Sequence, residues 1–297
     1  MRHHIKLLRP KHWAKNLFLF IPMFFAGKFF DPERTLDVFG GFLAFSFLAS
    51  SIYIINDYND VEDDRKHPEK RSRPLASGKV NPKLALLISL ILVLMGAVLA
   101  YLVDESGKFL FIVSIYYFLN LSYSFGLKNM SIVDILIVSA GFVLRVKGGA
   151  ILADVVATEW LVIMIFLLAL FMSIAKRRDD ILLKVATGTD MRRSMKGYNL
   201  DYLNTLLSLI CAVIIVSYIN YTVSEPTFEK FGHRLYYTSL FVIAGIMRYL
   251  QITFIQNKAG SPTEILFRDR FIQVTLVLWI ASFFVILYLR DSTFFDR

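Results

Sequence analysis

The stretch "NDYNDVEDDRKHPEKRSRPLASG", residues 56–78, separates two long apolar runs and consists almost entirely of charged, polar or turn-forming residues. Together with Lys79 it holds six carboxylates and six Lys or Arg side chains. The flanking runs, 38–56 and 83–103, contain few charges and are long enough to cross a bilayer core of about 30 Å. The stretch is therefore expected to be a polar loop that joins two membrane-spanning helices.

Apolar runs of this kind recur along the whole chain. Of the 297 residues, 56% are hydrophobic and 19% are charged, a composition too apolar for an ordinary soluble domain. The nine candidate spans are 15–30, 38–56, 83–103, 109–126, 131–151, 159–175, 202–223, 235–255 and 271–290. The alternation of apolar and polar residues that would indicate a β-barrel is absent. Because lipid offers backbone groups no hydrogen-bond partner, the spans are expected to be helices. The sequence thus predicts an all-α integral membrane protein with nine transmembrane helices in a single domain, residues 1–297.

The distribution of Lys and Arg predicts the orientation in the membrane, because cations in short loops stay on the cytoplasmic side. The N-terminal arm and the loops after spans two, four, six and eight carry five, six, one, seven and three of them, whereas the five opposite segments together carry seven. We therefore expect a multi-pass protein of the inner (plasma) membrane with a cytoplasmic N-terminus. The same asymmetry explains most of the net charge of +9, so nucleic-acid binding is not expected.

Several kinds of chemistry find no support in the sequence. Cys211 is the only cysteine and lies within a span, and the five His residues have no metal-ligand spacing. Neither a GxSxG nucleophile motif nor a Walker or GxGxxG phosphate loop occurs. Zinc and thiol chemistry are therefore not expected.

The carboxylates at the end of the second span fall on one side of a helix. If that helix continues to residue 64 at about 100° per residue, one face of roughly 100° carries Tyr53, Asn56, Asp57, Asp60 and Asp64. Carboxylates stacked at these spacings repel each other, which favours a bound cation. Mg²⁺ prefers hard oxygen ligands and completes its shell with water and phosphate oxygens. The predicted magnesium ligands are Asn56, Asp57, Asp60 and Asp64, of which the three aspartates are the predicted catalytic residues; the alternative is a solvated acidic turn.

Basic residues follow at once in "HPEKRSRPLASG", residues 67–78. Carboxylates that hold a divalent cation, followed by ammonium and guanidinium groups, form a complementary site for a diphosphate. Lys70, Arg71 and Arg73 are therefore predicted to bind its oxygens. For Lys70 and Arg71, a role in membrane topology is the alternative.

The motif Asn56-Asp57-x-x-Asp60-x-x-x-Asp64, placed after a second apolar span and followed by "RPLASG", resembles the UbiA superfamily of intramembrane prenyltransferases. The number of predicted spans, nine, also agrees with that superfamily, so the resemblance extends along essentially the whole chain. It implies a nine-helix bundle with a polar cavity on the cytoplasmic side, a Mg²⁺-bound diphosphate, and a lateral opening for a long isoprenoid tail.

The loop after the sixth span departs from the usual pattern of that superfamily, which has a second DxxxD motif there. In "AKRRDDILLKVATGTDMRRSMKGY", residues 175–198, the aspartates lack this spacing and Lys and Arg dominate. A loop rich in Lys and Arg is better suited to binding a phosphate group than to binding a second magnesium ion. The substitution resembles one branch of the superfamily, the decaprenyl-phosphate phosphoribosyltransferases of bacterial cell-wall arabinan (arabinogalactan) synthesis. The segments "LLRPKHWAKN", residues 7–16, and "EILFRDR", residues 264–270, add to this resemblance.

In that branch the isoprenoid is already a monophosphate and acts as the acceptor, while phosphoribosyl pyrophosphate (PRPP) supplies the diphosphate. The resemblance implies that PRPP and a polyprenyl (decaprenyl-like) phosphate are the substrates, that Mg²⁺ is the cofactor, and that the product is polyprenyl-phosphoryl-phosphoribose. Asn56 and Asp60 are then expected to ligate Mg²⁺, with Asp57 and Asp64 as further ligands or as partners in the outer shell.

A larger set of residues is predicted to bind substrate: Lys15, Tyr53, Lys70, Arg71, Arg73, Lys128, Arg145, Lys176, Arg177, Arg192, Lys196 and Tyr198. The alternatives are membrane topology for the loop cations, headgroup anchoring for Lys15, an interfacial position for Tyr53 and helix termination for Lys128. Arg145 and Lys147 lie inside the fifth span, where cations either face a functional cavity or snorkel to the surface. Glu264, Asp269 and Arg270 are expected either at the cavity edge or in loop ion pairs.

Two other functions stay open at this point. A prenyltransferase that moves an isoprenoid diphosphate onto an aromatic acceptor is the alternative within the superfamily, and the missing second DxxxD motif counts against it. A transporter would place ionisable groups near the bilayer midplane and show inverted repeats, whereas here they gather at the cytoplasmic ends of the spans. A homo-oligomer is compatible with the sequence, and the acceptor length is not specified by it.

Overall fold

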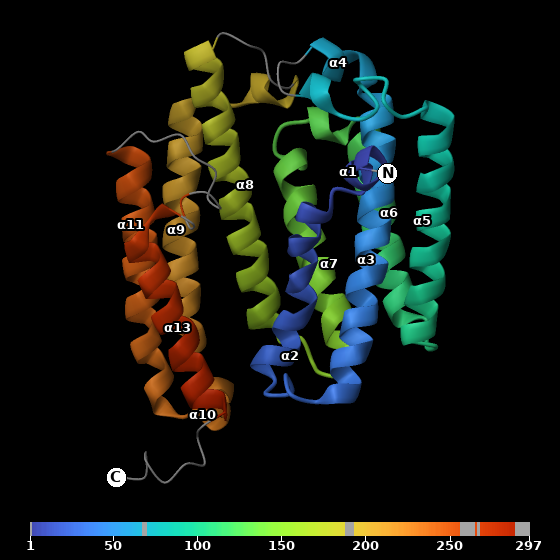
Figure 1. The fold of residues 1–297 in the computed structure, drawn as a ribbon. Helices are drawn as coiled ribbons and strands as arrows, with labels where there is room; N and C mark the ends of the chain where they lie inside the picture. The colour runs from blue at the N-terminus through green and yellow to red at the C-terminus, as the bar shows by residue number, and fades with distance from the viewer. Residues whose placement is uncertain (1, 67–69, 188–192, 256–264, 266–267, 289–297) are drawn as a thin grey trace. The chain divides into compact units, whose positions relative to one another are not determined.

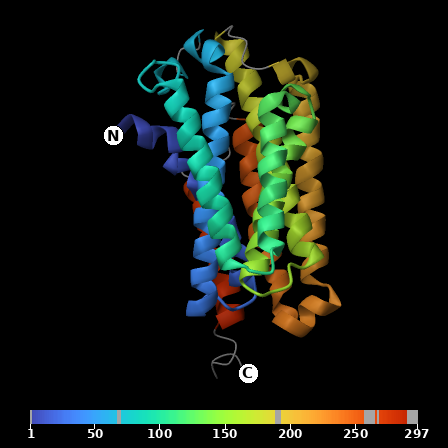
Figure 2. The same ribbon diagram turned by 90° about the vertical axis from the view of Figure 1, so that its right-hand side faces the viewer.

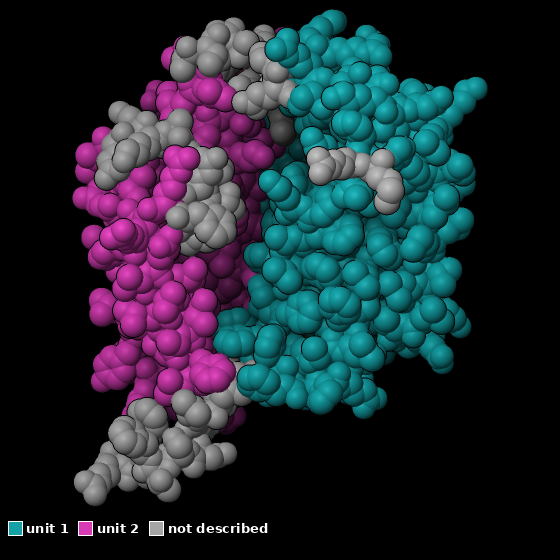
Figure 3. All heavy atoms as spheres, viewed as in Figure 1, with its two compact units in different colours: residues 1–158 teal, residues 159–297 magenta. Residues whose placement is uncertain are grey.

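The computed structural model describes residues 2–66, 70–187, 193–255, 265 and 268–288, and these form helices and connecting turns with no strand among them. The chain divides into two compact units, residues 1–158 and residues 159–297 (Figure 3). The all-helical prediction is confirmed, and the assignment of residues 1–297 to a single domain stays a prediction.

The first unit contains seven α-helices: α1 (Arg2–Leu8), α2 (Ile21–Phe25), α3 (Pro32–Asn59), α4 (Val61–Lys66), α5 (Pro82–Val103), α6 (Lys108–Phe125) and α7 (Val133–Leu152). Three 3₁₀ segments connect them: Pro10–Phe20, Lys70–Ser72 and Leu127–Asn129. Local sequence explains where the long helices begin. The Asp31 carboxylate accepts hydrogen bonds from the backbone nitrogens of Glu33 and Arg34 at the start of α3, and Asn81 caps α5 in the same way before Pro82.

The long helix α3 is the centre of the first unit. It packs against α5, α6, α7 and the 3₁₀ segment Pro10–Phe20 (Figures 1 and 2). The core between them includes the fully buried side chains of Leu19, Phe45 and Phe109. Gly149 of α7 allows the 3₁₀ segment to approach closely, because a Cβ at this position would collide with the backbone of Leu19.

The second unit contains α8 (Glu159–Thr187), α9 (Leu200–Thr222), α10 (Glu225–Phe231), α11 (Ser239–Phe254) and α13 (Arg270–Tyr288), with 3₁₀ segments Arg193–Gly197 and His233–Thr238. Helix α9 packs against α8 and α11, and α11 packs against α13. A buried hydrogen-bond chain joins these helices. The Trp279 indole donates to the Tyr218 hydroxyl at 2.7 Å, and that hydroxyl lies 2.7 Å from the Thr238 hydroxyl.

Seven of the nine predicted spans coincide with helices that are long and apolar enough to cross a membrane: 32–59, 82–103, 108–125, 133–152, 159–183, 200–222 and 233–254. The last predicted span coincides with α13, whose apolar part, Arg270–Ile286, is shorter. The first, 15–30, is not one helix, because its residues divide between the 3₁₀ segment Pro10–Phe20 and the short α2. The count of nine is therefore not confirmed: hydropathy identifies apolar residues but not an unbroken α-helical backbone.

The close approach at Gly149 gives a stability prediction. Gly149→Ala should lower the free energy of unfolding by about 1–3 kcal/mol, since the added methyl group must displace the Leu19 backbone. Gly245→Ala is the matched control, because its nearest neighbour, the Thr275 hydroxyl, would lie 3.5 Å from the new carbon. Thermal unfolding in detergent micelles measures both; an unchanged melting temperature for Gly149→Ala contradicts the packing described.

Candidate functional site

The candidate site is built at the C-terminal end of α3. The helix does not continue to Asp64 as expected from the sequence: it ends at Asn59, Asp60 has φ −95° and ψ 10°, and α4 begins at Val61. Two backbone hydrogen bonds bridge the break, from the Asp60 nitrogen to the Asn56 oxygen at 3.0 Å and from the Asp64 nitrogen to the Asp60 oxygen at 2.8 Å. The predicted single face therefore divides into two groups of side chains.

The first group, which we call the guanidinium cluster, consists of Asp57, Asp64, Arg9 and Arg73. Asp57 and Asp64 are each only 2% exposed. Arg73 Nη1 donates to Asp57 Oδ1 at 3.0 Å and to Asp64 Oδ2 at 2.7 Å, and Arg9 Nη2 donates to Asp57 Oδ1 at 2.5 Å. Each buried carboxylate is thus paired with a cation, as burial of charge requires.

Arg9 reaches this cluster from the N-terminal arm by an unusual backbone conformation. Its φ of 49° and ψ of 57° lie in the left-handed region, which disfavours residues with a Cβ. The turn between α1 and the 3₁₀ segment places the Arg9 guanidinium 4.9 Å from the centre of the Tyr53 ring. The same guanidinium forms the ion pair with Asp57. Sequence reasoning missed Arg9, because this cation lies 48 residues from its carboxylate and looked like a topology determinant.

The second group, which we call the lysine cluster, consists of Asn56, Asp60 and Lys128. Lys128 Nζ lies 2.7 Å from both carboxylate oxygens of Asp60 and 3.1 Å from Asn56 Oδ1. The Asn56 amide nitrogen donates to Asp60 Oδ2 at 3.0 Å. The side chains of Lys128 and Asp60 are 21% and 30% exposed, so this cluster is open to ligands to a degree that Asp57 and Asp64 are not.

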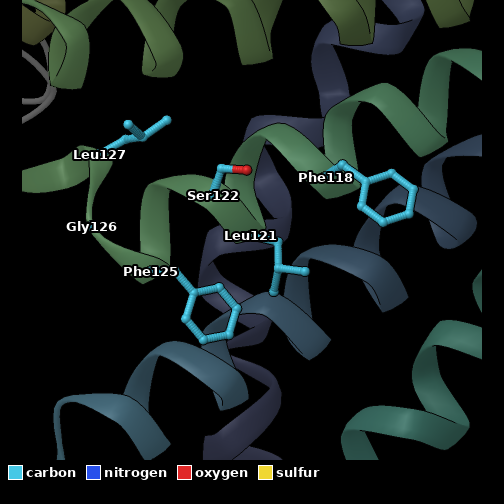
Figure 4. Close-up of a pocket in the computed structure, with 6 residues that line it drawn as sticks. All are labelled: Phe118, Leu121, Ser122, Phe125, Gly126 and Leu127. Carbon is cyan, nitrogen blue, oxygen red and sulfur yellow. The ribbon is translucent and has the colours of Figure 1, made fainter.

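Lys128 owes its position to the turn after α6. Gly126, with φ 156°, ends the helix, and the 3₁₀ segment Leu127–Asn129 follows directly. The last turns of α6 and this turn line a shallow pocket of about 480 Å³, with Phe118, Leu121 and Phe125 projecting from one side of the helix (Figure 4). The lining has no charged side chain, so the pocket offers contact to hydrocarbon rather than to phosphate.

Arg145 is held deep within the first unit, where it is 5% exposed. Its guanidinium donates to Asn16 Oδ1 at 2.7 Å, to the Gly141 carbonyl at 2.7 Å and to the Tyr116 hydroxyl at 2.9 Å. Asn16 in turn donates to the Ser46 hydroxyl at 2.9 Å. The alternative that Arg145 snorkels to the surface is therefore wrong, because neutral acceptors bind it in the interior; Lys147 by contrast is exposed.

The remaining predicted residues of the first unit lie around these clusters. Tyr53 is under the Arg9 guanidinium and its ring also meets His12 edge-on at 5.0 Å. Lys15 and Arg71 are exposed and Lys70 is half-buried, the last two in the 3₁₀ segment Lys70–Ser72. Their binding of phosphate stays a prediction.

In the second unit the predicted cations differ in exposure. Arg177 is 3% exposed and pairs with Asp180 at 3.1 Å, whereas Lys176 and Lys196 are exposed. Tyr198 is buried and stacks on Tyr202, with ring centres 6.3 Å apart. The predictions for Arg192 and Glu264 fall outside the described residues.

Two polar interactions of the second unit connect its helices and segments: the hydrogen bonds of Arg178 and the ion pair of Asp269. Arg178, which was not predicted, is 4% exposed and donates to Asn204 of α9 at 2.7 Å and to the Thr253 carbonyl of α11 at 3.0 Å. Asp269 accepts from Arg248 at 3.1 and 2.8 Å, and this hydrogen bond lowers the pKa of the Asp269 carboxyl. Asp269 thus forms an ion pair with α11, and its place at the cavity edge stays a prediction.

The donor chemistry of the lysine cluster fits a magnesium ion. Asn56 and Asp60 provide hard oxygen ligands, and Mg²⁺ typically uses one or two carboxylates together with water and phosphate oxygens. A full protein cage is not present: the described residues contain no group of three or more His, Cys, Asp or Glu side chains arranged to hold a metal. Asp57 and Asp64 fit less well, because both are 2% exposed and a guanidinium group already binds one oxygen of each.

A helical bundle with an Asn-Asp-x-x-Asp-x-x-x-Asp cluster at the end of a spanning helix defines a class of membrane transferase. Residues 17–273 match the UbiA prenyltransferase family, and the chain belongs to this family. Family membership and the apolar helices together make it a multi-pass membrane protein.

Within the family, the chain is similar to proteins named decaprenyl-phosphate phosphoribosyltransferase. It is 32% identical to that of Corynebacterium glutamicum, covering 96% of this chain and 86% of the relative. It is also 32% identical to that of Mycolicibacterium smegmatis, covering 96% and 92%. The fold resembles a UbiA homologue from Archaeoglobus fulgidus bound to DMAPP and Mg²⁺, with a TM-score of 0.70 and 19% identity over 96% of this chain and 99% of that one.

The guanidinium cluster gives a second stability prediction. Arg73→Gln should lower the free energy of unfolding by about 1.5–3 kcal/mol, because it removes charged hydrogen bonds from two buried carboxylates. Arg71→Gln, two residues away and exposed, should leave stability within about 0.5 kcal/mol. Thermal unfolding of both variants tests this expectation, and equal melting temperatures would show that Arg73 does not hold the two carboxylates.

Proposed function

We propose that this chain transfers the 5-phosphoribosyl group of PRPP to a polyprenyl phosphate and releases pyrophosphate, with Mg²⁺ as cofactor. The names of the relatives in Corynebacterium glutamicum and Mycolicibacterium smegmatis support this choice of reaction. The observation that carries it is the lysine cluster, where hard oxygen donors and a cation lie within 3.1 Å of each other. A metal-bound diphosphate needs both kinds of group.

The proposed reaction exchanges one oxygen for another at C1 of the ribose. The bond from C1 to pyrophosphate breaks with its electron pair on the leaving group, and an oxygen of the lipid phosphate bonds to C1. Bound Mg²⁺ neutralises the charge that develops on pyrophosphate. Asn56 and Asp60 would hold the metal, and Lys128 would neutralise phosphate oxygens beside it. The attacking phosphate is already an anion, so no side chain has to remove a proton.

Asp57 and Asp64 have a different role in this proposal. They are buried and their oxygens accept from Arg9 and Arg73, so we assign them as positioning residues that hold two guanidinium groups at the edge of the site. Arg73, 26% exposed, can present its remaining donors to a phosphate, which a planar guanidinium binds well.

The proposed location is the inner (plasma) membrane with the N-terminus in the cytoplasm. The excess of cations in alternate loops supports this orientation. It places α4 and the clusters at the end of α3 on the side where a water-soluble, highly charged substrate such as PRPP is made. The product would then enter synthesis of the arabinan of a bacterial cell wall, the role that the resemblance of the sequence implies.

Activity measurements test this function directly. Purified protein given PRPP, Mg²⁺ and polyprenyl phosphate should release pyrophosphate and form a phosphoribosylated lipid, both quantified by mass spectrometry. Asp60→Asn should lower kcat/KM at least 100-fold, about 3 kcal/mol of transition-state stabilisation. Asp63→Asn, an exposed neighbour that belongs to neither cluster, should stay within twofold of the wild type.

The outcome also separates this function from the prenyltransferase alternative. Absence of both products across several acceptor lengths would contradict the phosphoribosyl transfer. Turnover of a prenyl diphosphate with an aromatic acid, without turnover of PRPP, would instead support a prenyltransferase. The fold is compatible with that outcome, because it resembles the DMAPP-bound homologue.

A further inference from the structure

We propose that Lys128 couples the binding of the divalent cation to the binding of the diphosphate, so that the site takes the two together and binds bare metal weakly. This inference rests on the metal and diphosphate site of the proposed function. It concerns the order and strength of binding at that site, and not the identity of the transferred group.

The Lys128 ammonium and a divalent cation compete for the same oxygens. Lys128 Nζ contacts Asp60 Oδ1 and Oδ2 at 2.7 Å each and Asn56 Oδ1 at 3.1 Å. These are the oxygens with which Asn56 and Asp60 would ligate Mg²⁺, at about 2.0–2.1 Å. Two cations cannot both occupy them, because they would lie within a few ångström of each other in a partly buried site. Metal binding therefore requires the ammonium to leave.

The other two aspartates of the motif offer the displaced ammonium no substitute for Asp60. Asp57 and Asp64 are the other buried carboxylates of the motif, and Arg9 and Arg73 already bind them. The Lys128 side chain is 21% exposed, so water compensates only part of the lost interaction. A bare metal ion thus breaks a favourable ion pair without bringing a new anionic partner for the lysine.

A diphosphate that accompanies the metal removes this cost. Phosphate oxygens bound to a metal at Asp60 lie beside the displaced ammonium, and the flexible four-carbon stem of lysine can follow them. Lys128 then exchanges one anionic partner for another. Linkage requires the effect to be reciprocal: the diphosphate raises the affinity for the metal by the same factor as the metal raises the affinity for the diphosphate.

The coupling is measured without lipid and without catalysis. Mn²⁺ replaces Mg²⁺ as an electron paramagnetic resonance probe, and its affinity for the full-length protein is determined with and without inorganic pyrophosphate at a buffered free Mn²⁺ concentration. In the wild type, pyrophosphate should tighten Mn²⁺ binding at least 30-fold. In Lys128→Met, Mn²⁺ alone should bind at least tenfold tighter than to the wild type, and the effect of pyrophosphate should fall at least tenfold.

Lys83→Met is the matched control. Lys83 is an exposed lysine at the start of α5 in the same unit, and its side chain makes no ion pair with any described residue. Its substitution removes the same charge and should change neither affinity more than twofold. A general effect of net charge would alter both variants alike and would overturn the proposal.

Other results also decide the question. If Lys128→Met binds bare Mn²⁺ no tighter than the wild type, or keeps the full effect of pyrophosphate, Lys128 does not compete with the metal. Should that variant fail to fold, Lys128→Gln is measured in its place, and a wild type without coupling already contradicts the proposal. Loss of coupling in Lys128→Met, in a protein that turns over no PRPP, would leave this inference standing and reject the proposed reaction alone.

Discussion

The pairing of carboxylates with cations at the end of α3 is the constraint on which the first unit depends. Asp57 and Asp64 are nearly inaccessible to solvent, and a buried carboxylate without a partner is strongly unfavourable. Their partners come from the N-terminal arm, through Arg9, and from the segment after α4, through Arg73. The turn after α6 supplies Lys128 to Asp60. Charge neutralisation thus brings three chain segments to one helix end.

In the proposed function, the two clusters share the binding of a metal-bound diphosphate. The lysine cluster is partly exposed, and its oxygens suit a small divalent cation. The guanidinium cluster is buried around its carboxylates, which fix the guanidinium groups in place. Such fixed charges can stabilise a departing pyrophosphate without reorganising during the reaction. This division fits the proposed reaction, which would need electrostatic stabilisation and positioning but no general base.

The sequence predicts the elements of the site better than its contacts. Apolar runs locate the spanning helices, and the spacing of Asn56 and the three aspartates identifies the family motif. Both signals are local in the sequence. A helical wheel assumes a continuous helix, however, and so could not show that the backbone breaks at Asp60. Hydropathy likewise treats residues 15–30 as a span, although the backbone there is 3₁₀ as far as Phe20 and α-helical only over Ile21–Phe25.

Long-range partners were the part that sequence could not supply. Arg9 meets Asp57 across 48 residues and Lys128 meets Asp60 across 68, and nothing in either local pattern selects these pairs from the many cations of the chain. Arg145 was a candidate ligand because intramembrane cations are usually functional. Only the fold shows that Asn16, Gly141 and Tyr116 already accept its hydrogen bonds.

The four residues of the motif serve two purposes in the proposed site: Asn56 and Asp60 hold the metal, and Asp57 and Asp64 hold guanidinium groups. A structure of the protein with Mn²⁺ and PRPP, in which anomalous scattering locates the metal, tests this most directly. We expect manganese on Asn56 and Asp60, with Arg9 and Arg73 still bound to Asp57 and Asp64. Manganese ligated by Asp57 and Asp64, with both guanidinium groups displaced, would contradict it.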